Sequence, residues 1–325
     1  MINFPIDAIQ FQNQFGTDAQ CEAAIAKLRW PNGFRCPNCG HDDGYKISTR
    51  RQIQCCVCRH QASITSGTIF HRTHLPLTCW FWIIYQIAQD KGGASATRLA
   101  SQLNRPYKTI WFVLQKLRYA MGARDAGISL AGLIEMDEAV LGPECRRPAK
   151  QDGKIVRYCV EENAQKKPWG LVARDGRKRK EVMEVFILVE AERFHAGNVV
   201  MKMMPNKTYY AIRDVIEQRV DEDQWFRTDA HSTHWVLRTL SRNFKIVKSS
   251  EAVECEALPV LHRVIALLKH FLMGTYFGVS TKYLPGYLNE FCFRFMRREK
   301  EQSLYVSLLR ACVFALPYSC AELKL

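Results

Sequence analysis

Two pairs of cysteines constrain the fold of this chain more than any other feature of its sequence. Cys36 with Cys39, and Cys55 with Cys58, each enclose two residues. Each tight turn presents two sulfurs on one side, and two such turns close a tetrahedral cage of four thiolates, the usual structural zinc site. The segment has few large apolar residues and would not fold by packing alone. The spacing therefore predicts a Zn²⁺ ribbon over residues 34–72; Cys56 could replace Cys55, but Cys55 keeps the two-residue spacing.

The charge of the chain indicates a polyanionic partner. Its 325 residues carry a net charge of +14, and nucleic acid is the commonest partner of so basic a protein. The N-terminus lacks the pattern of a signal peptide, and the apolar run from Trp80 to Ala88 is too short to cross a bilayer. Thirteen cysteines without a signal favour metal binding over disulfides. We expect a soluble cytoplasmic protein that makes no membrane contact.

Residues 73–128 have the apolar period of helices, and their second part predicts a helix-turn-helix. Ser95 or Thr97 can begin one helix, and residues 104–106 break it. A second helix follows over residues 107–119. In such a motif the first helix supports the second, and the second enters the major groove of DNA. The alternative is an ordinary helical hairpin that packs in a core. The residues expected to contact DNA are Lys108, Thr109, Lys116 and Arg118.

After Gly132 the pattern changes to short strands alternating with helices, which predicts an α/β sheet domain. Two of the strands end in an acidic residue, Asp137 and Asp229. Either one alone is explained by a strand-end cap or an ion pair. On neighbouring strands, however, the two carboxylates would bind a divalent ion such as Mg²⁺, which takes one or two carboxylates together with phosphate oxygens.

Four segments of the chain share a pattern with one protein family. They are Leu267–Arg298, Ile134–Glu138, Thr228-Asp229 and Gln61–Phe70. The first resembles the end of the zinc-ribbon transposases of insertion sequences, and the others resemble the two aspartate strands and the segment after the ribbon. This resemblance implies an α/β RNase H-like core, with a mixed five-stranded sheet and helices on both faces, that cuts DNA ends and joins them to a target. It runs from about residue 19 to about residue 299.

The chain is accordingly divided into five parts. These are an N-terminal helical segment (1–33), the ribbon (34–72), the helix-turn-helix region (73–128), the catalytic domain (129–300) with a basic insert (143–181), and a C-terminal helical tail (301–325).

The resemblance also implies a third metal ligand on a helix, seven residues before a lysine. Counting back from Lys269 gives His262, and seven residues are close to two helical turns, so the two side chains share a face. Imidazole is a softer ligand than carboxylate and favours Mn²⁺ somewhat over Mg²⁺. Glu254 and Glu256 remain alternatives, because the stretch before His262 lacks the asparagines expected of the family. Lys269 would contact a phosphate near the scissile bond.

The insert at residues 143–181 is strongly basic and lacks a clear period. Such runs are usually solvated faces, but a run between the two aspartate strands can also follow a phosphate backbone. The residues proposed for this contact are Arg177, Lys178, Arg179 and Lys180. A second positive patch is expected from Arg294, Arg297 and Arg298.

Together these features predict a DNA transposase that binds element ends and catalyses metal-dependent cleavage and strand transfer. Its partners would be the terminal inverted repeats and a target duplex, and paired-end chemistry favours a homodimer associated with the nucleoid. Two other interpretations stay open: a zinc-ribbon transcription regulator without chemistry, and a decayed or domesticated transposase that binds DNA without cutting it. The strand-end aspartates distinguish a transposase from a regulator, because a regulator does not require them.

Overall fold

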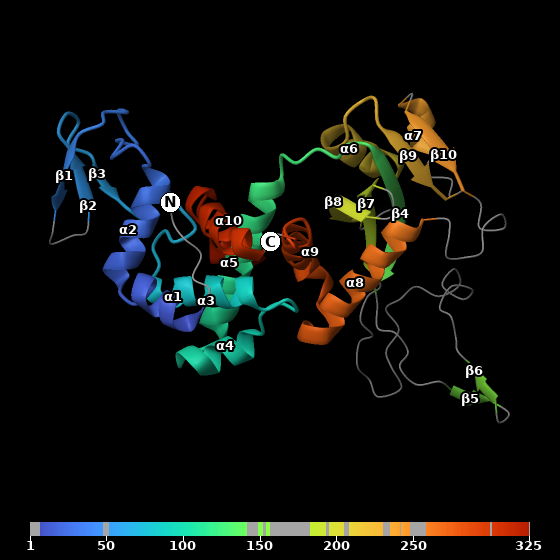
Figure 1. The fold of residues 1–325 in the computed structure, drawn as a ribbon, viewed down its shortest axis with the longest axis horizontal. Helices are drawn as coiled ribbons and strands as arrows, with labels where there is room; N and C mark the ends of the chain where they lie inside the picture. The colour runs from blue at the N-terminus through green and yellow to red at the C-terminus, as the bar shows by residue number, and fades with distance from the viewer. Residues whose placement is uncertain are drawn as a thin grey trace. The chain divides into compact units, whose positions relative to one another are not determined.

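The structure, a computed structural model, describes residues 7–47, 52–141, 149–151, 154–156, 183–192, 195–204, 208–229, 235–240, 242–247, 258–299 and 301–324. The chain divides into two compact units, whose elements are labelled in Figure 1. Residues 1–127 combine with residues 293–325 in one, which we term the helical unit. Residues 128–292 form the other, the sheet unit.

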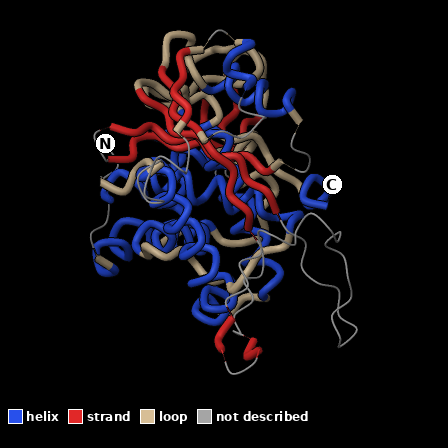
Figure 2. The backbone as a smooth tube through the Cα atoms, turned by 90° about the vertical axis from the view of Figure 1, so that its right-hand side faces the viewer, coloured by secondary structure: helices blue, strands red, loops and turns tan. Residues whose placement is uncertain are grey.

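The helical unit consists mainly of helices, drawn in blue in Figure 2. They are α1 (Ala8–Phe15), α2 (Asp18–Arg29), α3 (Leu77–Gln89), α4 (Ala96–Leu103), α5 (Tyr107–Asp125), α10 (Glu301–Phe314) and α11 (Cys320–Lys324). Thr17 and Gln20 form a reciprocal capping box that starts α2. Asn104 ends α4 in the left-handed conformation, so that α5 can begin after a short break. The predicted helix pair after Ser95 is therefore present as α4 and α5.

Three short strands lie between α2 and α3 along the chain. They are β1 (Gly44–Ile47), β2 (Gln52–Cys55) and β3 (Gln61–Ser63), and they pair antiparallel in that order. Arg29 at the end of α2 donates hydrogen bonds to the carbonyls of Ser63 (3.1 Å) and Ile64 (2.9 Å). These bonds attach the small sheet to the helical unit.

One apolar core holds the helical unit together. It includes Phe81 of α3, Leu117 of α5 and Leu308 of α10, all with 0% exposure. α10 packs against α3 and α5, and the backbone N–H of Ile69 donates to the carbonyl of Cys312 (3.1 Å). Residues 301–325, expected to be a tail, instead complete the core that the first 127 residues begin.

The sheet unit is built on a five-stranded sheet in the order β10-β9-β4-β7-β8. β7 pairs antiparallel with both β4 and β8, whereas β9 lies parallel to β4 and to β10. The expected mixed five-stranded sheet is thus confirmed. Its strands are β4 (Leu133–Leu141), β7 (Met183–Glu192), β8 (His195–Met203), β9 (Trp225–Thr228) and β10 (Asn243–Ile246); a separate antiparallel pair, β5 (Ala149–Gln151) and β6 (Lys154–Val156), lies in the predicted insert.

Side chains alternate across β4, so its two faces have different partners. Ile134 and Met136 join an apolar cluster with residues of α6 (Tyr209–Arg219) and α7 (Val236–Thr239). Glu135 and Asp137 lie on the opposite face, which is covered by α8 (Pro259–Tyr276). Helices therefore cover both faces of the sheet. A short 3₁₀ turn (Thr281–Tyr283) and α9 (Leu284–Phe295) follow α8.

No single helix in the described ranges is both long enough and apolar enough to span a bilayer. Only α8 combined with the Thr281–Phe295 segment reaches the required length and hydropathy, and that pair is bent by 115°.

Candidate functional site

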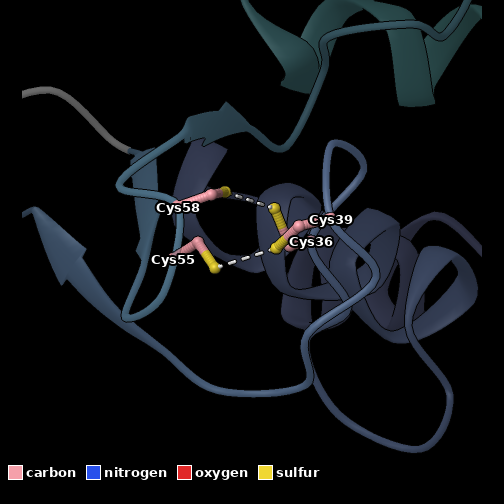
Figure 3. Close-up of side chains that lie close together, drawn as sticks. All are labelled: Cys36, Cys39, Cys55 and Cys58. Atoms are coloured by element: carbon pink, nitrogen blue, oxygen red, sulfur yellow. Dashed lines mark hydrogen bonds between the residues drawn. The ribbon is translucent and has the colours of Figure 1, made fainter.

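The four predicted zinc ligands lie together, with their side chains turned toward one another (Figure 3). Their sulfurs are all within 4.8 Å of one another. The Sγ–Sγ distances from Cys36 to Cys58 and from Cys39 to Cys55 are both 3.5 Å. A tetrahedral ion with Zn–S bonds of about 2.3 Å requires sulfurs about 3.8 Å apart, so the cluster fits zinc. Cys56 is exposed and lies outside the cluster, which leaves Cys55 as the ligand of the second pair.

The two cysteine turns share one backbone design. In each, the N–H of the first cysteine donates to the carbonyl of the histidine that follows the motif: Cys36 to His41 at 2.7 Å, and Cys55 to His60 at 3.0 Å. The residue directly after the second cysteine has a positive φ in both turns, 75° at Gly40 and 55° at Arg59. This repetition aims both pairs of sulfurs at a common point.

The pKa values of two of the clustered cysteines are shifted in opposite directions. A backbone hydrogen bond from His60 lowers the pKa of the Cys58 thiol to about 6. At Cys39 the backbone hydrogen bond from His41 also lowers the pKa, but hydrogen bonds with Cys58 and other thiols, together with desolvation, outweigh it and raise the pKa to about 12. Four thiolates so close together repel one another unless a cation lies between them. The ribbon is therefore a site for structural zinc.

Asp137 and Asp229 lie at the same end of two adjacent parallel strands. β4 and β9 pair in a single register whose last paired residues are Met136 and Thr228. Asp137 and Asp229 each follow these last paired residues by one position. Both side chains are partly exposed, and Asp137 Oδ1 accepts a hydrogen bond from the N–H of Glu138 (2.7 Å). The sheet thus places two acidic residues from distant parts of the sequence at the same end of neighbouring strands.

His262 and Lys269 lie two turns apart on α8, and both are exposed. Within the described ranges, the four cysteines are the only group of three or more Cys, His, Asp or Glu side chains close enough to hold one ion. His262 is therefore not gathered with the two aspartates in this conformation. Glu254 and Glu256 lie outside the described residues, so the identity of the third ligand stays a prediction.

The sequence interpretation missed a buried glutamate beside the aspartates. Glu135 has 0% exposure and pairs with Arg227 of β9 (Oε1 to Nη1, 3.2 Å). Its other oxygen accepts the N–H of Leu261 in α8 (2.8 Å). Leaving this carboxylate without a partner would cost about 3–5 kcal/mol, because a buried charge would be uncompensated. The available signal was an acidic residue two positions before Asp137 in an otherwise apolar strand.

The expected DNA-contacting residues of α5 fall into two groups. Lys108 and Thr109 are exposed at the start of the helix. Lys116 and Arg118 are buried, with 9% and 2% exposure. Lys116 Nζ donates to the carbonyl of Ile69 (3.4 Å), and burial lowers its pKa. The prediction that Lys116 and Arg118 face DNA is therefore wrong for this fold, because other parts of the helical unit cover that side of α5.

Two arginines of the expected C-terminal patch also make contacts inside the helical unit. Arg294 donates to the carbonyls of Ile87 and Asp90 at the end of α3. Arg297 forms a paired contact with Asp125 at the end of α5 (Nη2 to Oδ1 2.6 Å, Nη1 to Oδ2 2.9 Å). These two side chains join helices and do not form a free positive patch. Arg177, Lys178, Arg179 and Lys180 lie outside the described residues.

A shallow hollow in the sheet unit lies away from the aspartates. Its volume is about 560 Å³, and it is lined by residues that include Gly132, Trp225 and Lys245. Its lining runs from the amino ends of β4 and β9 to Arg227 and Lys245 further along their strands, and includes neither Asp137 nor Asp229. The hollow is therefore not the candidate site.

Comparison with known proteins connects both parts of the chain to one class. Residues 16–61 match the transposase zinc-ribbon domain, and residues 129–296 match the ISXO2-like transposase domain. An uncharacterized protein in the transposable element ISH50 of Halobacterium salinarum is 25% identical over 151 residues, which are 44% of this chain and 50% of that protein. The chain thus matches about half the length of this curated relative.

A transposase zinc ribbon followed by a transposase domain defines a transposase of the insertion-sequence class. This chain belongs to the ISXO2-like transposase family.

Proposed function

We propose that the chain cuts the ends of its element and joins them to target DNA with divalent metal ions. The observation that carries this proposal is the register of β4 and β9, because Asp137 and Asp229 each follow its last paired residues, Met136 and Thr228, by one position. Oxygen ligands from two strands suit Mg²⁺ or Mn²⁺, which take few protein carboxylates and complete their shell with phosphate oxygens and water.

The residues around the aspartates would divide the work. Asp137 and Asp229 would hold the ion, and His262 would supply the third ligand. Lys269, on the same side of α8 as His262, places a positive charge against a phosphate near the cut. A bound ion of this kind lowers the pKa of an attacking water and stabilises the leaving oxygen. The same residues would then orient the freed 3′-hydroxyl for strand transfer.

The sheet topology supports an RNase H-like core. Numbered by chain order, the five strands lie as 5-4-1-2-3, with the first three antiparallel and the fourth and fifth parallel to the first. This is the arrangement expected of that fold, and it places the first and fourth strands side by side, as the aspartates require.

DNA recognition is assigned to the helical unit. The ribbon and the α4–α5 pair would bind the terminal repeats, with Lys108 and Thr109 at the start of α5 nearest the bases, as in a helix-turn-helix. For Arg177, Lys178, Arg179 and Lys180 the support is the charge of the sequence alone. Two ends must be joined in one event, which favours a homodimer acting on DNA at the nucleoid.

The proposal is tested with a supercoiled plasmid that carries the DNA flanking this reading frame. Wild-type protein should nick and open the plasmid in Mn²⁺, and Asp137→Asn and Asp229→Asn should not. Asp223→Asn is the control, because Asp223 is exposed in the turn before β9, at the other end of the strands. Equal cleavage by wild type and both aspartate variants would reject the proposal.

A regulator that only binds DNA is not favoured. Such a protein needs neither paired strand-end carboxylates nor a transposase domain, and the match over residues 129–296 is to that domain. A decayed transposase would bind the same plasmid ends and leave them uncut in Mn²⁺.

A further inference from the structure

One buried carboxylate of β4 contacts two other segments of the sheet unit, β9 and α8. Glu135 lies within β4 with 0% exposure. Its Oε1 accepts a hydrogen bond from Arg227 Nη1 on β9 (3.2 Å), and its Oε2 accepts one from the N–H of Leu261 on α8 (2.8 Å). Each oxygen therefore holds a different element against β4.

These contacts lie directly beside the proposed metal ligands in the sequence. Glu135 precedes Asp137 by two residues, and Arg227 precedes Asp229 by two. Because strand side chains alternate, Glu135 and Asp137 share the face of the sheet that α8 covers. Leu261 is the residue before His262. The three segments are thus fixed within two residues of the positions that matter.

The contact with α8 also compensates for a missing helix cap. The N-cap residue is Leu258, no side-chain cap hydrogen bond is formed there, and Pro259 begins the helix. The N–H of Leu261 is one of the first four of the helix, which have no acceptor within it. The Glu135 carboxylate supplies that acceptor and places a negative charge at the positive end of the helix. Because the hydrogen bond is directional, it fixes the position of α8 along β4 and the side of α8 that is buried.

We propose that Glu135 is a positioning residue that sets His262 and Lys269 of α8 in register with Asp137 and Asp229. This inference rests on the proposed function, which assigns a shared ion and phosphate to those side chains. Glu135 itself is fully buried and both of its oxygens accept hydrogen bonds within the protein, so it acts through its neighbours. Residues that orient metal ligands typically change metal affinity or activity about 10–100-fold when replaced.

The chain offers a matched control in Glu190 of β7. It is also buried, at 9% exposure, and it also accepts backbone hydrogen bonds, from Ala131 (2.9 Å) and Asn198 (2.7 Å). It pairs across the strands with Ile134 and so lies on the face opposite Glu135. Replacing either glutamate would lower the stability of the sheet. Only the replacement of Glu135 should also change metal binding at Asp137 and Asp229.

The first experiment measures plasmid cleavage against Mn²⁺ concentration for full-length wild type, Glu135→Gln and Glu190→Gln. The glutamine keeps the size of the side chain and removes its charge. We expect Glu135→Gln to raise the half-saturating Mn²⁺ concentration about 10-fold or more, with DNA binding retained. Glu190→Gln should leave that concentration unchanged. Equal half-saturation in the two variants would overturn the role of Glu135.

The second experiment needs no metal and no cleavage. Amide hydrogen exchange is compared between wild type and Glu135→Met, which keeps the volume and removes the acceptor. Faster exchange at Leu261, with Leu268 further along α8 unchanged, is expected; unchanged protection at Leu261 would overturn the proposed docking. A wild type that does not cut DNA in Mn²⁺ contradicts the proposed function, whereas a wild type that cuts, with Glu135→Gln equal to Glu190→Gln, contradicts only the inference about Glu135.

Discussion

The zinc ribbon and the carboxylate site are assembled in opposite ways. The ribbon takes all four sulfurs from residues 36–58 and holds them within 4.8 Å of one another. The proposed sheet site would take Asp137 and Asp229 from strands whose paired residues differ by 92 in number, and among the described residues no third Cys, His, Asp or Glu is close enough to share an ion with them. One site is local and complete, and the other is long-range and partly formed.

This difference separates the role of zinc in the ribbon from that of the ion proposed for the sheet. The ribbon has few buried apolar residues, among them Ile53 and Ala62, so the zinc-binding energy is also its folding energy. The sheet has an apolar cluster with α6 and α7 on one face and buried apolar residues of α8 on the other. We therefore expect metal removal to unfold the first region and only to inactivate the second.

The largest effect should come from removing zinc. Structural zinc contributes about 10–16 kcal/mol in comparable small modules. Chelation should abolish the amide protection of β2 while leaving that of β7 intact, as measured by hydrogen exchange. If the β2 amides stayed protected in the presence of chelator, the conclusion that zinc is needed to fold the ribbon would be contradicted.

The neighbouring cysteines supply a control for the zinc prediction. Cys58→Ser removes a member of the cluster and should reproduce the effect of chelation, since the thiolate is the ligand. Cys56→Ser changes an exposed thiol outside the cluster and should keep zinc and fold.

The next largest effect is expected at the aspartates. Loss of a metal ligand removes several kcal/mol of transition-state stabilisation, so Asp137→Asn should slow cleavage about 10³-fold or more. Its melting temperature should stay close to that of the wild type, because Asp137 is partly exposed and lies outside the apolar clusters. If Asp137→Asn unfolded the protein as zinc removal is expected to unfold the ribbon, the distinction between a folding ion and a catalytic ion would be contradicted.

Alkaline pH should destabilise the helical unit. Burial raises the pKa of the Cys21 thiol to about 12, and it also raises the pKa of the Cys312 thiol and of the Tyr305 phenol. Each folded-state pKa lies above its unfolded value, so stability is fully present below the unfolded pKa and falls as pH rises toward the folded one. For the deeply buried Cys312, the loss is about 1.4 kcal/mol for each pH unit above about 8.5.

This prediction is checked by urea unfolding of the helical unit between pH 8 and pH 10. Cys312→Ala should reduce the loss of stability across this range, and Cys320→Ala, which changes an exposed thiol, should not. An identical pH slope in all three proteins would contradict the assignment.

The smallest effect concerns DNA binding by α5. Lys108→Ala should lower the slope of log affinity against log salt by about 1, because one phosphate contact is lost. Lys116→Met should alter stability and leave that slope unchanged, since Lys116 is buried against Ile69. Fluorescence anisotropy with a labelled duplex from the element end measures both slopes. A reduced slope in Lys116→Met alone would reverse the assignment of the two lysines.

The sequence was most informative where the structure is local. The cysteine spacing predicts the ribbon because both turns are set by a few adjacent residues. The apolar strands and their acidic ends predict that Asp137 and Asp229 lie at strand ends, and β4 and β9 are neighbours in the sheet. Their roles, and that of His262, stay predictions.

Contacts between distant segments could not be read from periodicity. The apolar face of α5 was evident, but α10 packs on the same helix from nearly 200 residues away along the chain, and Lys116 meets Ile69. Polar side chains can therefore be buried on a face that looks solvated. The partners of Glu135 were hidden for the same reason, because they depend on strand register and on how α8 docks.

The division of the helical unit between the two ends of the chain has a consequence for its synthesis. A ribosome that has reached residue 292 has made the whole sheet unit, but the helical core still lacks Tyr305, Leu308 and Leu309. Domains fold largely as they emerge, so the sheet can form first while the N-terminal helices wait with an open apolar surface. We expect a nascent chain stopped after Cys292 to hold a folded sheet and an aggregation-prone N-terminal part, so that the helical unit can complete its core only after α10 has been synthesised.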